Sequence, residues 1–310
     1  MGQGTGFGKV ILFNEHFVVY GIPAVVSAIG AKTTALVERK PGSGYEVKDE
    51  RPETPGYKAE KIQQQKESLD IMLEAMKIDT QHYHYVITLG GDLIAASGVG
   101  ASAASCAAVA RAFSQELGLN FSDERVNEVA FEGEKGYHGT PSGIDNTAAT
   151  YGGLIWYRRE GSVQHMERMR LRKPVEIVMG NTGKVADTKS VVAGVKERKE
   201  REPEKYGRLL QDADQLAWNA RKQLEDFNLE KVGACMNENH RLLQEIGVSS
   251  QELDTLVKLA REAGAVGAKL TGGGRGGYMV ALTPGRELQN RVANEIDRSG
   301  AQALRTMIGI

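Results

Sequence analysis

The sequence predicts an α+β protein of two halves, because strand-like and helix-like segments do not alternate regularly along its 310 residues. The first fifty residues contain β-branched and apolar runs broken by glycine and proline, at 10–13, 24–29 and 33–39. After about residue 181 the pattern becomes mostly helical. We therefore expect one domain over residues 1–180, a second over residues 181–310, and a cleft where the two meet.

The composition argues against nucleic-acid-binding, membrane-spanning and disulfide-rich secreted classes of protein. The chain is 41% hydrophobic and 25% charged, as expected of a globular protein with a sizeable core. Its net charge of −1 gives no bias toward nucleic acid or anionic membranes. No apolar run approaches the roughly 18–20 residues of a membrane helix, and no secretory leader is visible. The only two cysteines, Cys106 and Cys235, lie far apart in helix-like contexts, so we expect a reducing, cytoplasmic location.

Several elements are expected in the first half. Residues 59–77 are helix-like, and residues 83–89 alternate as a strand does. Small residues and apolar spacing predict a helix from Ser102 to Gly118. Strands are expected at 153–159 and 174–180.

The helix that follows carries an acidic side chain on its apolar face. Ser122 is a suitable N-cap, and acids occupy the first turn. Val126, Ala130 and Glu134 recur at four-residue spacing, so they share one face. We therefore expect the Glu134 carboxylate to point toward the interior.

The second half is predicted to be helical up to a final glycine loop. A long amphipathic run extends from Tyr206 to Phe227. A capping box from Ser249 to Glu252 begins another helix, which Gly264 ends. Then come a strand, a glycine loop, a strand and a turn over residues 268–285, a helix over 286–299 and a terminal strand.

Glycine clusters at the start of the chain and around 90–100, 133–153 and 272–277, which suggests places where backbone approaches a ligand. The loop ASGVGASAAS at 96–105 opens a helix, and the N–H groups of such a loop form an anion site. Tight helix packing through small residues is the alternative. The chain contains no Walker A motif.

The second loop, TGGGRGG at 271–277, matches a dinucleotide pattern only nominally, since a strand and not a helix follows it. A tight turn between strands is the alternative there. Lys9 and Asp145 taken singly would be an ordinary surface lysine and turn residue, and Glu134 with His138 offers too few ligands for zinc. Together, two glycine loops, an interior carboxylate and a Lys–Asp pair are what phosphoryl transfer requires.

Three segments then resemble the motifs of the GHMP kinase superfamily, in order. They are GKVILFNEHFVVYG at 8–21, SGVGASAAS at 97–105 and KLTGGGRGGYMVAL at 269–282. Within the superfamily the first motif and FEGEKGYHGTPSGIDN at 131–146 resemble the mevalonate kinase family. The length of the chain suggests a bacterial or archaeal member with trimmed loops. The resemblance implies an N-terminal α+β domain like ribosomal protein S5 and a C-terminal ferredoxin-like α+β domain.

The resemblance also implies roles for named residues. Asp145 matches the group that orients or deprotonates the substrate hydroxyl, and Lys9 matches its cationic partner. Ser102 and Glu134 match the ligands of Mg²⁺. The ATP phosphates would be bound by the loop residues Gly98, Val99, Gly100, Ala101, Ser102, Ala103 and Ala104. Mevalonate would be bound by Glu15, His16, Ser142, Gly143, Thr188, Gly273 and Gly274.

That assignment offers a reason for the polar residues inside the apolar first motif. Burying Glu15 and His16 without partners would cost several kcal/mol. We expect the strand to end there and to turn both side chains into the active site. Three positions depart from the family pattern: Asn14 stands where glycine is usual, Ala101 replaces a serine hydroxyl near the phosphates, and Ser97 stands near a position that is often glycine or flanked by proline.

The resemblance implies ATP- and Mg²⁺-dependent phosphorylation of the 5-hydroxyl of mevalonate, a step of isoprenoid synthesis. The alternatives are a related kinase acting on phosphomevalonate or a sugar, and a non-catalytic ligand sensor on the same fold. Members of the family often form homodimers, so the resemblance raises that arrangement too.

Overall fold

A computed structural model describes residues 1–96, 98–161, 163–184 and 188–310, without the side chains of Thr188 and Lys189. Contacts group the chain into two compact units. Unit 1 holds residues 1–9 and 28–152, and unit 2 holds residues 10–27 and 153–310. Each unit is made of two separate stretches of the chain. This is because the long strands β1 (Gly2–Phe13) and β2 (Ala24–Pro41) each have residues in both units. The domain division at residue 180 stays a prediction about the family modules.

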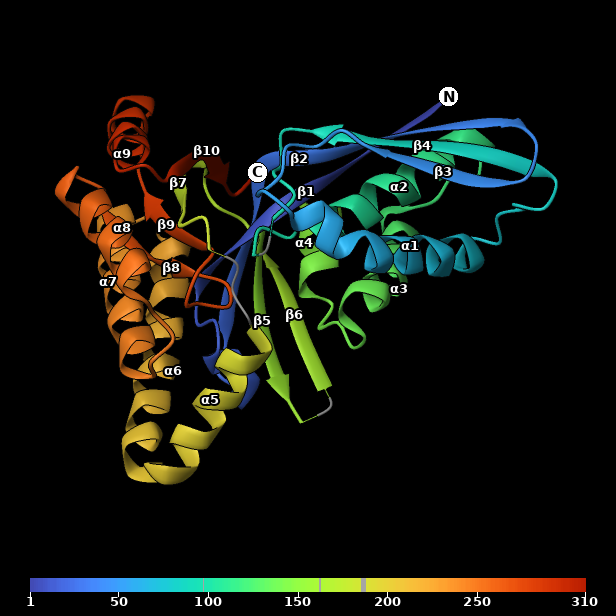
Figure 1. Ribbon diagram of the computed structural model, residues 1–310. Helices are drawn as coiled ribbons and strands as arrows, with labels where there is room; N and C mark the ends of the chain where they lie inside the picture. The colour runs from blue at the N-terminus through green and yellow to red at the C-terminus, as the bar shows by residue number, and fades with distance from the viewer. Residues whose placement is uncertain (97, 162, 185–187) are drawn as a thin grey trace. The chain divides into compact units, whose positions relative to one another are not determined.

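Unit 1 is a small sheet covered by helices (Figure 1). Its strands run in the order β3 (Gly44–Asp49), β4 (Tyr83–Gly91) and β2, with β1 paired to β2. Strand β4 is antiparallel to β2 and parallel to β3. The helices are α1 (Tyr57–Ala75), α2 (Ala101–Leu117), α3 (Asp123–His138) and α4 (Ile144–Tyr151).

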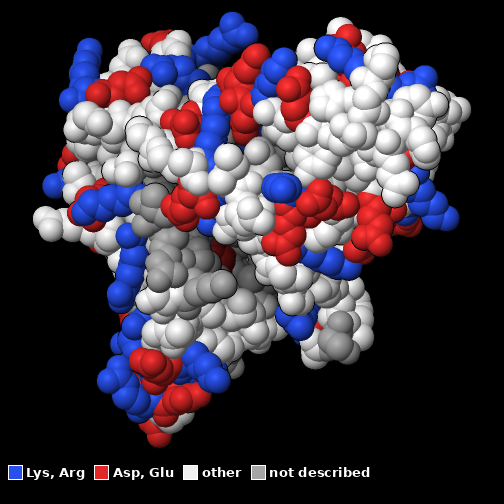
Figure 2. Space-filling model, turned by 45° about the vertical axis from the view of Figure 1, so that its right-hand side comes forward, with Lys and Arg blue, Asp and Glu red and all other residues white. Residues whose placement is uncertain are grey.

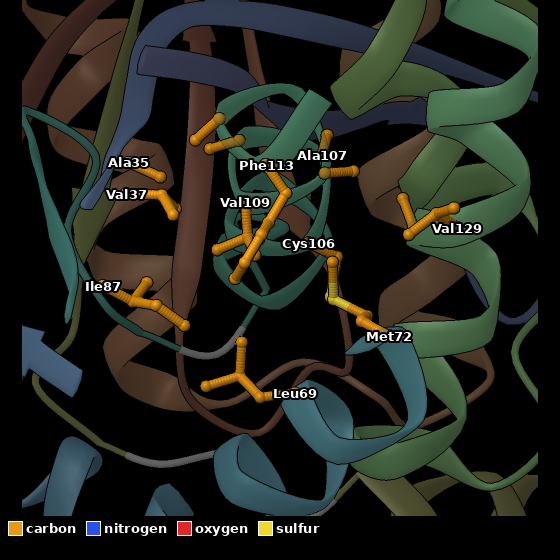
Figure 3. Packing of buried hydrophobic residues seen from close by; sticks show 14 of the residues in the cluster. Ala35, Val37, Leu69, Met72, Ile87, Cys106, Ala107, Val109, Phe113 and Val129 are labelled. Atoms are coloured by element: carbon orange, nitrogen blue, oxygen red, sulfur yellow. The ribbon is translucent and has the colours of Figure 1, made fainter. Parts of the chain in front are cut away.

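The core of unit 1 lies between this sheet and α1, α2 and α3 (Figure 3). Phe113 of α2 meets Tyr85 of β4 edge-on, with ring centroids 5.2 Å apart. Cys106 of α2 is a buried free thiol beside Met72 of α1. The predicted limits of α2 and the Ser122 cap of α3 are confirmed, since Gly118 ends α2 and the Ser122 hydroxyl accepts from the Arg125 N–H.

The N-terminal glycine cluster packs against a helix and does not approach a ligand. A Cβ atom at Gly2, Gly4 or Gly6 would lie 2.0–2.2 Å from a backbone oxygen of α2. Because no real side chain tolerates such a distance, β1 lies directly on α2 at every second residue. The prediction that this cluster marks a ligand was therefore wrong.

The sheet strands of unit 2 run in the order β10 (Gln302–Ile308), β7 (Val175–Asn181), β9 (Tyr278–Leu282) and β8 (Gly267–Thr271). All of these neighbours are antiparallel. A hairpin of β5 (Leu154–Glu160) and β6 (Val163–Met169) pairs with residues 24–27 of β2 through β5.

Helices cover these strands (Figure 1). They are α5 (Thr188–Arg201), α6 (Pro203–Glu225), α7 (Leu229–Glu245), α8 (Gln251–Glu262) and α9 (Arg286–Arg298), with a short 3₁₀ helix at Phe17–Tyr20. Helices α7 and α8 contact β8, α9 contacts β7 and β10, and α6 packs on α7. Cys235 of α7 is also a buried free thiol.

Three local expectations were wrong. Gly30 does not break the strand, so the runs at 24–29 and 33–39 are parts of one strand, β2. The cap of α8 is Ser250, whose hydroxyl accepts from the Leu253 N–H, while the Ser249 hydroxyl bonds to Asp254. Strand β6 was not anticipated, because its residues are almost all exposed and carry little apolar signal.

The surface agrees with the near-neutral charge of the sequence. On the face that Figure 2 shows, basic and acidic side chains are interspersed. Among the helices within the described ranges, none has the length and apolarity needed to cross a bilayer.

Candidate active site

The glycine loop before α2 has the form of an anion site. Gly98 and Gly100 both have left-handed backbones, with φ of 91° and 71°. The Lys9 N–H donates to the Val99 carbonyl at 2.9 Å, which fixes the loop to β1. No side chain of the described residues caps α2, so the first N–H groups of this helix are left for a ligand. Ser97, in the same loop, lies outside the described residues.

Gly100 is the point where this loop passes the Lys9 side chain. A Cβ atom at Gly100 would lie 2.7 Å from Lys9 Cγ. The left-handed φ of 71° also disfavours any other residue. Glycine at this position therefore lets the loop and the Lys9 side chain occupy neighbouring space.

Lys9 and Asp145 form the predicted pair, with Lys9 Nζ 3.4 Å from Asp145 Oδ1. The Lys9 side chain is 7% exposed, whereas Asp145 is 31% exposed and accessible to a substrate. The sequence placed Asp145 in a turn, and this was wrong. It lies in the first turn of α4, after Gly143, which has a left-handed φ of 81°. An acidic residue is favourable in the first turn of a helix, because the helix dipole is positive there.

Glu134 is buried on α3 as predicted, with 1% of its surface exposed. Burial, and then the nearby Asp145 carboxylate, raise the pKa of Glu134 to about 8, and a hydrogen bond from the Ser102 hydroxyl opposes this rise. Among the described residues no group hydrogen-bonds to Glu134 Oε1. His138 Nε2 lies 3.4 Å from Ser102 Oγ and 3.7 Å from Glu134 Oε2.

A polar cavity of about 230 Å³ is lined by four of the predicted site residues of unit 1. Its lining includes Glu134, Ser142, Gly143 and Asp145. The N–H of Ile144 donates to the Ser142 hydroxyl at 3.4 Å, so this loop is tied to the start of α4. The cavity is therefore lined by the carboxylates of Glu134 and Asp145 and by the Ser142 hydroxyl. The Lys9 ammonium adjoins it through its pair with Asp145.

Within unit 2, Glu15 is held by Lys269, a partner that sequence reasoning missed. Glu15 is 2% exposed and Lys269 is fully buried, and the two form a short ion pair. Lys269 Nζ also donates to the Leu270 carbonyl at 2.6 Å. The cost of burying Glu15 is therefore offset by a buried cation of β8.

His16 bonds to the third motif within the same unit. Its Nε2 lies 3.0 Å from the carbonyl oxygen of Gly273, so Nε2 carries the proton. Burial lowers the pKa of His16 to about 4, and the nearby Lys269 and Arg198 charges act in the same direction. The ring is therefore neutral near pH 7, and its Nδ1 is a hydrogen-bond acceptor.

The glycine loop between β8 and β9 is more than a simple turn. Gly274 has a φ of 73°, and a Cβ atom there would lie 2.2 Å from the Val248 carbonyl oxygen. The Arg275 N–H donates to that same carbonyl at 2.9 Å. The loop is thus shaped by close contact with the segment before α8. Thr188 begins α5, but its side chain lies outside the described residues.

Sequence reasoning also missed Arg51, which supports the first glycine loop. Arg51 is buried, pairs with both oxygens of Asp49 and donates to the Ala101 carbonyl at 3.2 Å. It lines a cavity at the start of α2 together with Tyr57, Lys58 and other residues. The sequence offered one sign of this site, because Lys48, Asp49 and Arg51 lie together at the end of β3. The residues that Arg51 contacts in α2 are distant in sequence, so that sign could not identify them.

Comparison with known proteins agrees with this geometry. The GHMP kinase N-terminal domain matches residues 65–153, and the GHMP kinase C-terminal domain matches residues 220–302. Mevalonate kinase of Pyrococcus abyssi is 34% identical over 97% of this chain and 93% of its own length. That of Aeropyrum pernix is 34% identical over 94% of this chain and 91% of its own length.

A solved structure gives the same result. The crystal structure of L. major mevalonate kinase in complex with R-mevalonate is 40% identical, with a TM-score of 0.96, and the match covers 99% of this chain and 96% of that one. The motifs, their arrangement in each unit and these relatives lead to one conclusion. The chain belongs to the mevalonate kinases of the GHMP kinase family.

Proposed function

We propose that the chain transfers the γ-phosphoryl group of ATP to the 5-hydroxyl of mevalonate, with Asp145 and Lys9 at the reacting hydroxyl. The single observation that carries this assignment is the Lys9–Asp145 pair, 3.4 Å apart, in the unit that also holds the uncapped start of α2. Phosphoryl transfer depends mainly on positioning and electrostatics, and these groups supply both.

The N-terminal turn of α2 would hold the ATP phosphates. The backbone N–H groups of Ala101, Ser102 and Ala103 lie at a helix end without a side-chain cap among the described residues, where the dipole favours negative charge, while the Ala104 N–H donates to the Gly100 carbonyl. Buried alanines at 101, 103 and 104 leave the main chain close to a ligand. The adjacent cavity lined by Arg51 and Lys58 offers further positive charge to the nucleotide.

Ser102 and Glu134 fit the needs of Mg²⁺. The ion prefers oxygen ligands and is usually held by one or two carboxylates, with waters and substrate phosphates completing its shell. Glu134 Oε1 is buried and has no partner among the described residues, and the Ser102 hydroxyl bonds to the same carboxylate. When bound, the ion would neutralise charge on the transferring phosphates. Glu134 and Ser102 would hold it at the start of α2.

Asp145 would accept the hydrogen of the substrate hydroxyl and orient its oxygen toward the γ-phosphorus. Its partial exposure leaves room for that contact, and the Lys9 ammonium lies 3.4 Å from its Oδ1. As charge develops on the transferring group, Lys9 would stabilise it.

His16 would bind a hydroxyl of mevalonate and not its carboxylate. Because Nε2–H is committed to Gly273, the ring presents only the Nδ1 acceptor. A carboxylate needs a donor, whereas a hydroxyl supplies one. Glu15, whose partner is Lys269, would support this loop. Ser142, Gly143, Thr188, Gly273 and Gly274 stay predicted substrate contacts, and the homodimer and cytoplasmic location stay predictions.

The test is ADP release by the purified protein with Mg·ATP, with and without mevalonate. We expect strong dependence on mevalonate, and little release with phosphomevalonate or sugars. Asp145→Ala should lower kcat by orders of magnitude and leave nucleotide affinity intact. ATP binding without ADP release on any of these alcohols would favour a ligand sensor, and near-normal turnover by Asp145→Ala would remove its assigned role.

A further inference from the structure

Asn14 occupies a backbone position that suits glycine. Its φ is 69°, in the left-handed region, and its side chain is fully buried. Asparagine tolerates this region better than most residues, but a buried amide must be hydrogen-bonded. Glycine would adopt this backbone without strain, so the turn itself does not require the Asn14 amide.

The amide is fully satisfied by a second buried asparagine and two carbonyls. The backbone N–H of Asn14 donates to Asn239 Oδ1 at 3.1 Å. In return, the side-chain Nδ2 of Asn239 donates to Asn14 Oδ1 at 2.9 Å. Asn14 Nδ2 donates to the carbonyls of Pro23 and Ala213, each at 2.9 Å. Asn239 is also fully buried.

These bonds fasten the turn to three other segments of unit 2. Pro23 precedes β2, Ala213 lies in α6 and Asn239 lies in α7. The next residues of the same turn are Glu15 and His16, which bond to β8 and to the glycine loop after it. His16 too has a left-handed φ, of 51°. The position of its ring therefore depends on a backbone that the Asn14–Asn239 pair holds.

We propose that Asn14 and Asn239 are positioning residues for substrate binding: their reciprocal amide bonds hold the His16 ring against Gly273. The inference rests on the proposed function, because it takes His16 to contact mevalonate. The pair acts on substrate affinity and not on the phosphoryl-transfer groups, which belong to unit 1.

The experiment measures kcat and both KM values for Asn14→Gly, Asn14→Ala, Asn239→Ala and the double variant Asn14→Gly/Asn239→Ala. Losing a buried hydrogen bond should raise KM for mevalonate about tenfold. The KM for ATP should stay within about twofold of wild type, and kcat should change less than KM for mevalonate. Asn14→Ala should be worse than Asn14→Gly, since alanine also disfavours the left-handed backbone.

The double variant tests whether the two amides act together. Its KM for mevalonate should rise by clearly less than the product of the two single effects, because both single changes break the bond from Asn239 Nδ2 to Asn14 Oδ1. Asn290→Ala, at an exposed position on α9, is the matched amide control and should behave as wild type. If the alanine variants do not fold, Asn14→Gly still tests the inference, because glycine accepts the backbone.

Two results would overturn the inference. One is an unchanged KM for mevalonate in Asn14→Gly and Asn239→Ala. The other is an equal loss of kcat with both KM values altered alike, which would indicate general damage to the fold. A wild-type protein that binds ATP but releases no ADP with mevalonate would instead overturn the proposed function, and this inference with it.

Discussion

Removing the cation of the buried Glu15–Lys269 pair should strongly destabilise unit 2. Lys269 is fully buried and Glu15 is 2% exposed, so Lys269→Met removes the buried ammonium that pairs with this carboxylate. Breaking a buried pair in this way costs about 3–5 kcal/mol of unfolding free energy. Glu15→Gln/Lys269→Met should cost clearly less than the sum of the single changes, because it leaves no buried charge. Lys258→Met, from an exposed pair with Glu262, should cost less than about 0.5 kcal/mol.

Tryptophan fluorescence during urea unfolding measures this effect directly. The only two tryptophans, Trp156 and Trp218, both lie in unit 2 and contact each other. Their signal therefore reports the unit that holds the ion pair. Lys269→Met should move the unfolding midpoint far below that of wild type and of Lys258→Met. A loss no larger than that of Lys258→Met, or single changes that simply add in the double variant, would refute the reasoning.

Three further outcomes are expected. Gly100→Ala should lower kcat at least tenfold with the fold retained, because the new Cβ would lie 2.7 Å from Lys9 Cγ. Steady-state kinetics would measure kcat, and urea unfolding would verify that stability is unchanged. An unchanged kcat would contradict the prediction. Glu134→Gln should raise the Mg²⁺ concentration for half-maximal rate at least tenfold, which a Mg²⁺ titration at saturating ATP measures; an unchanged requirement would exclude Glu134 as a ligand. Burial lowers the pKa of His240 from 6.5 to about 4, so the free energy of unfolding falls as the pH drops from 6.5 toward 4. His240→Gln should make the decrease in unfolding free energy between pH 6.5 and 4.5 smaller by about 2 kcal/mol. Urea unfolding at both pH values measures this, and an equal decrease in both proteins would contradict it.

Local patterns predicted the features that depend on neighbours in sequence. The Ser122 cap and the inward position of Glu134 follow from helix periodicity over a few turns, and both are confirmed. Asp145 was misplaced in a turn because Gly143 and the residues before it carry turn signals, while α4 is only eight residues long. Short helices have weak periodicity, so the turn signal prevailed.

Contacts between distant segments were not predictable from one sequence. Lys269 lies 254 residues from Glu15, and its place in a short strand gives no sign that it is buried. Arg51 lies 50 residues from Ala101, whose carbonyl it binds. The sequence could indicate that Glu15 needed a partner, since its burial would otherwise be costly, but not which residue supplied it.

The two missed cations perform the same task in different units. Glycine has no side chain with which to fix a backbone conformation, so other groups help to hold the shape of a glycine-rich loop. In unit 1, Arg51 pairs with Asp49 and donates to the Ala101 carbonyl, directly after the first glycine loop. In unit 2, Lys269 pairs with Glu15 and donates to the Leu270 carbonyl, directly before the second. Buried ion pairs often add little net stability, and they persist where they fix one conformation. Both pairs lie directly beside a glycine loop and bond to its flanking backbone, so each helps to hold the shape of that loop.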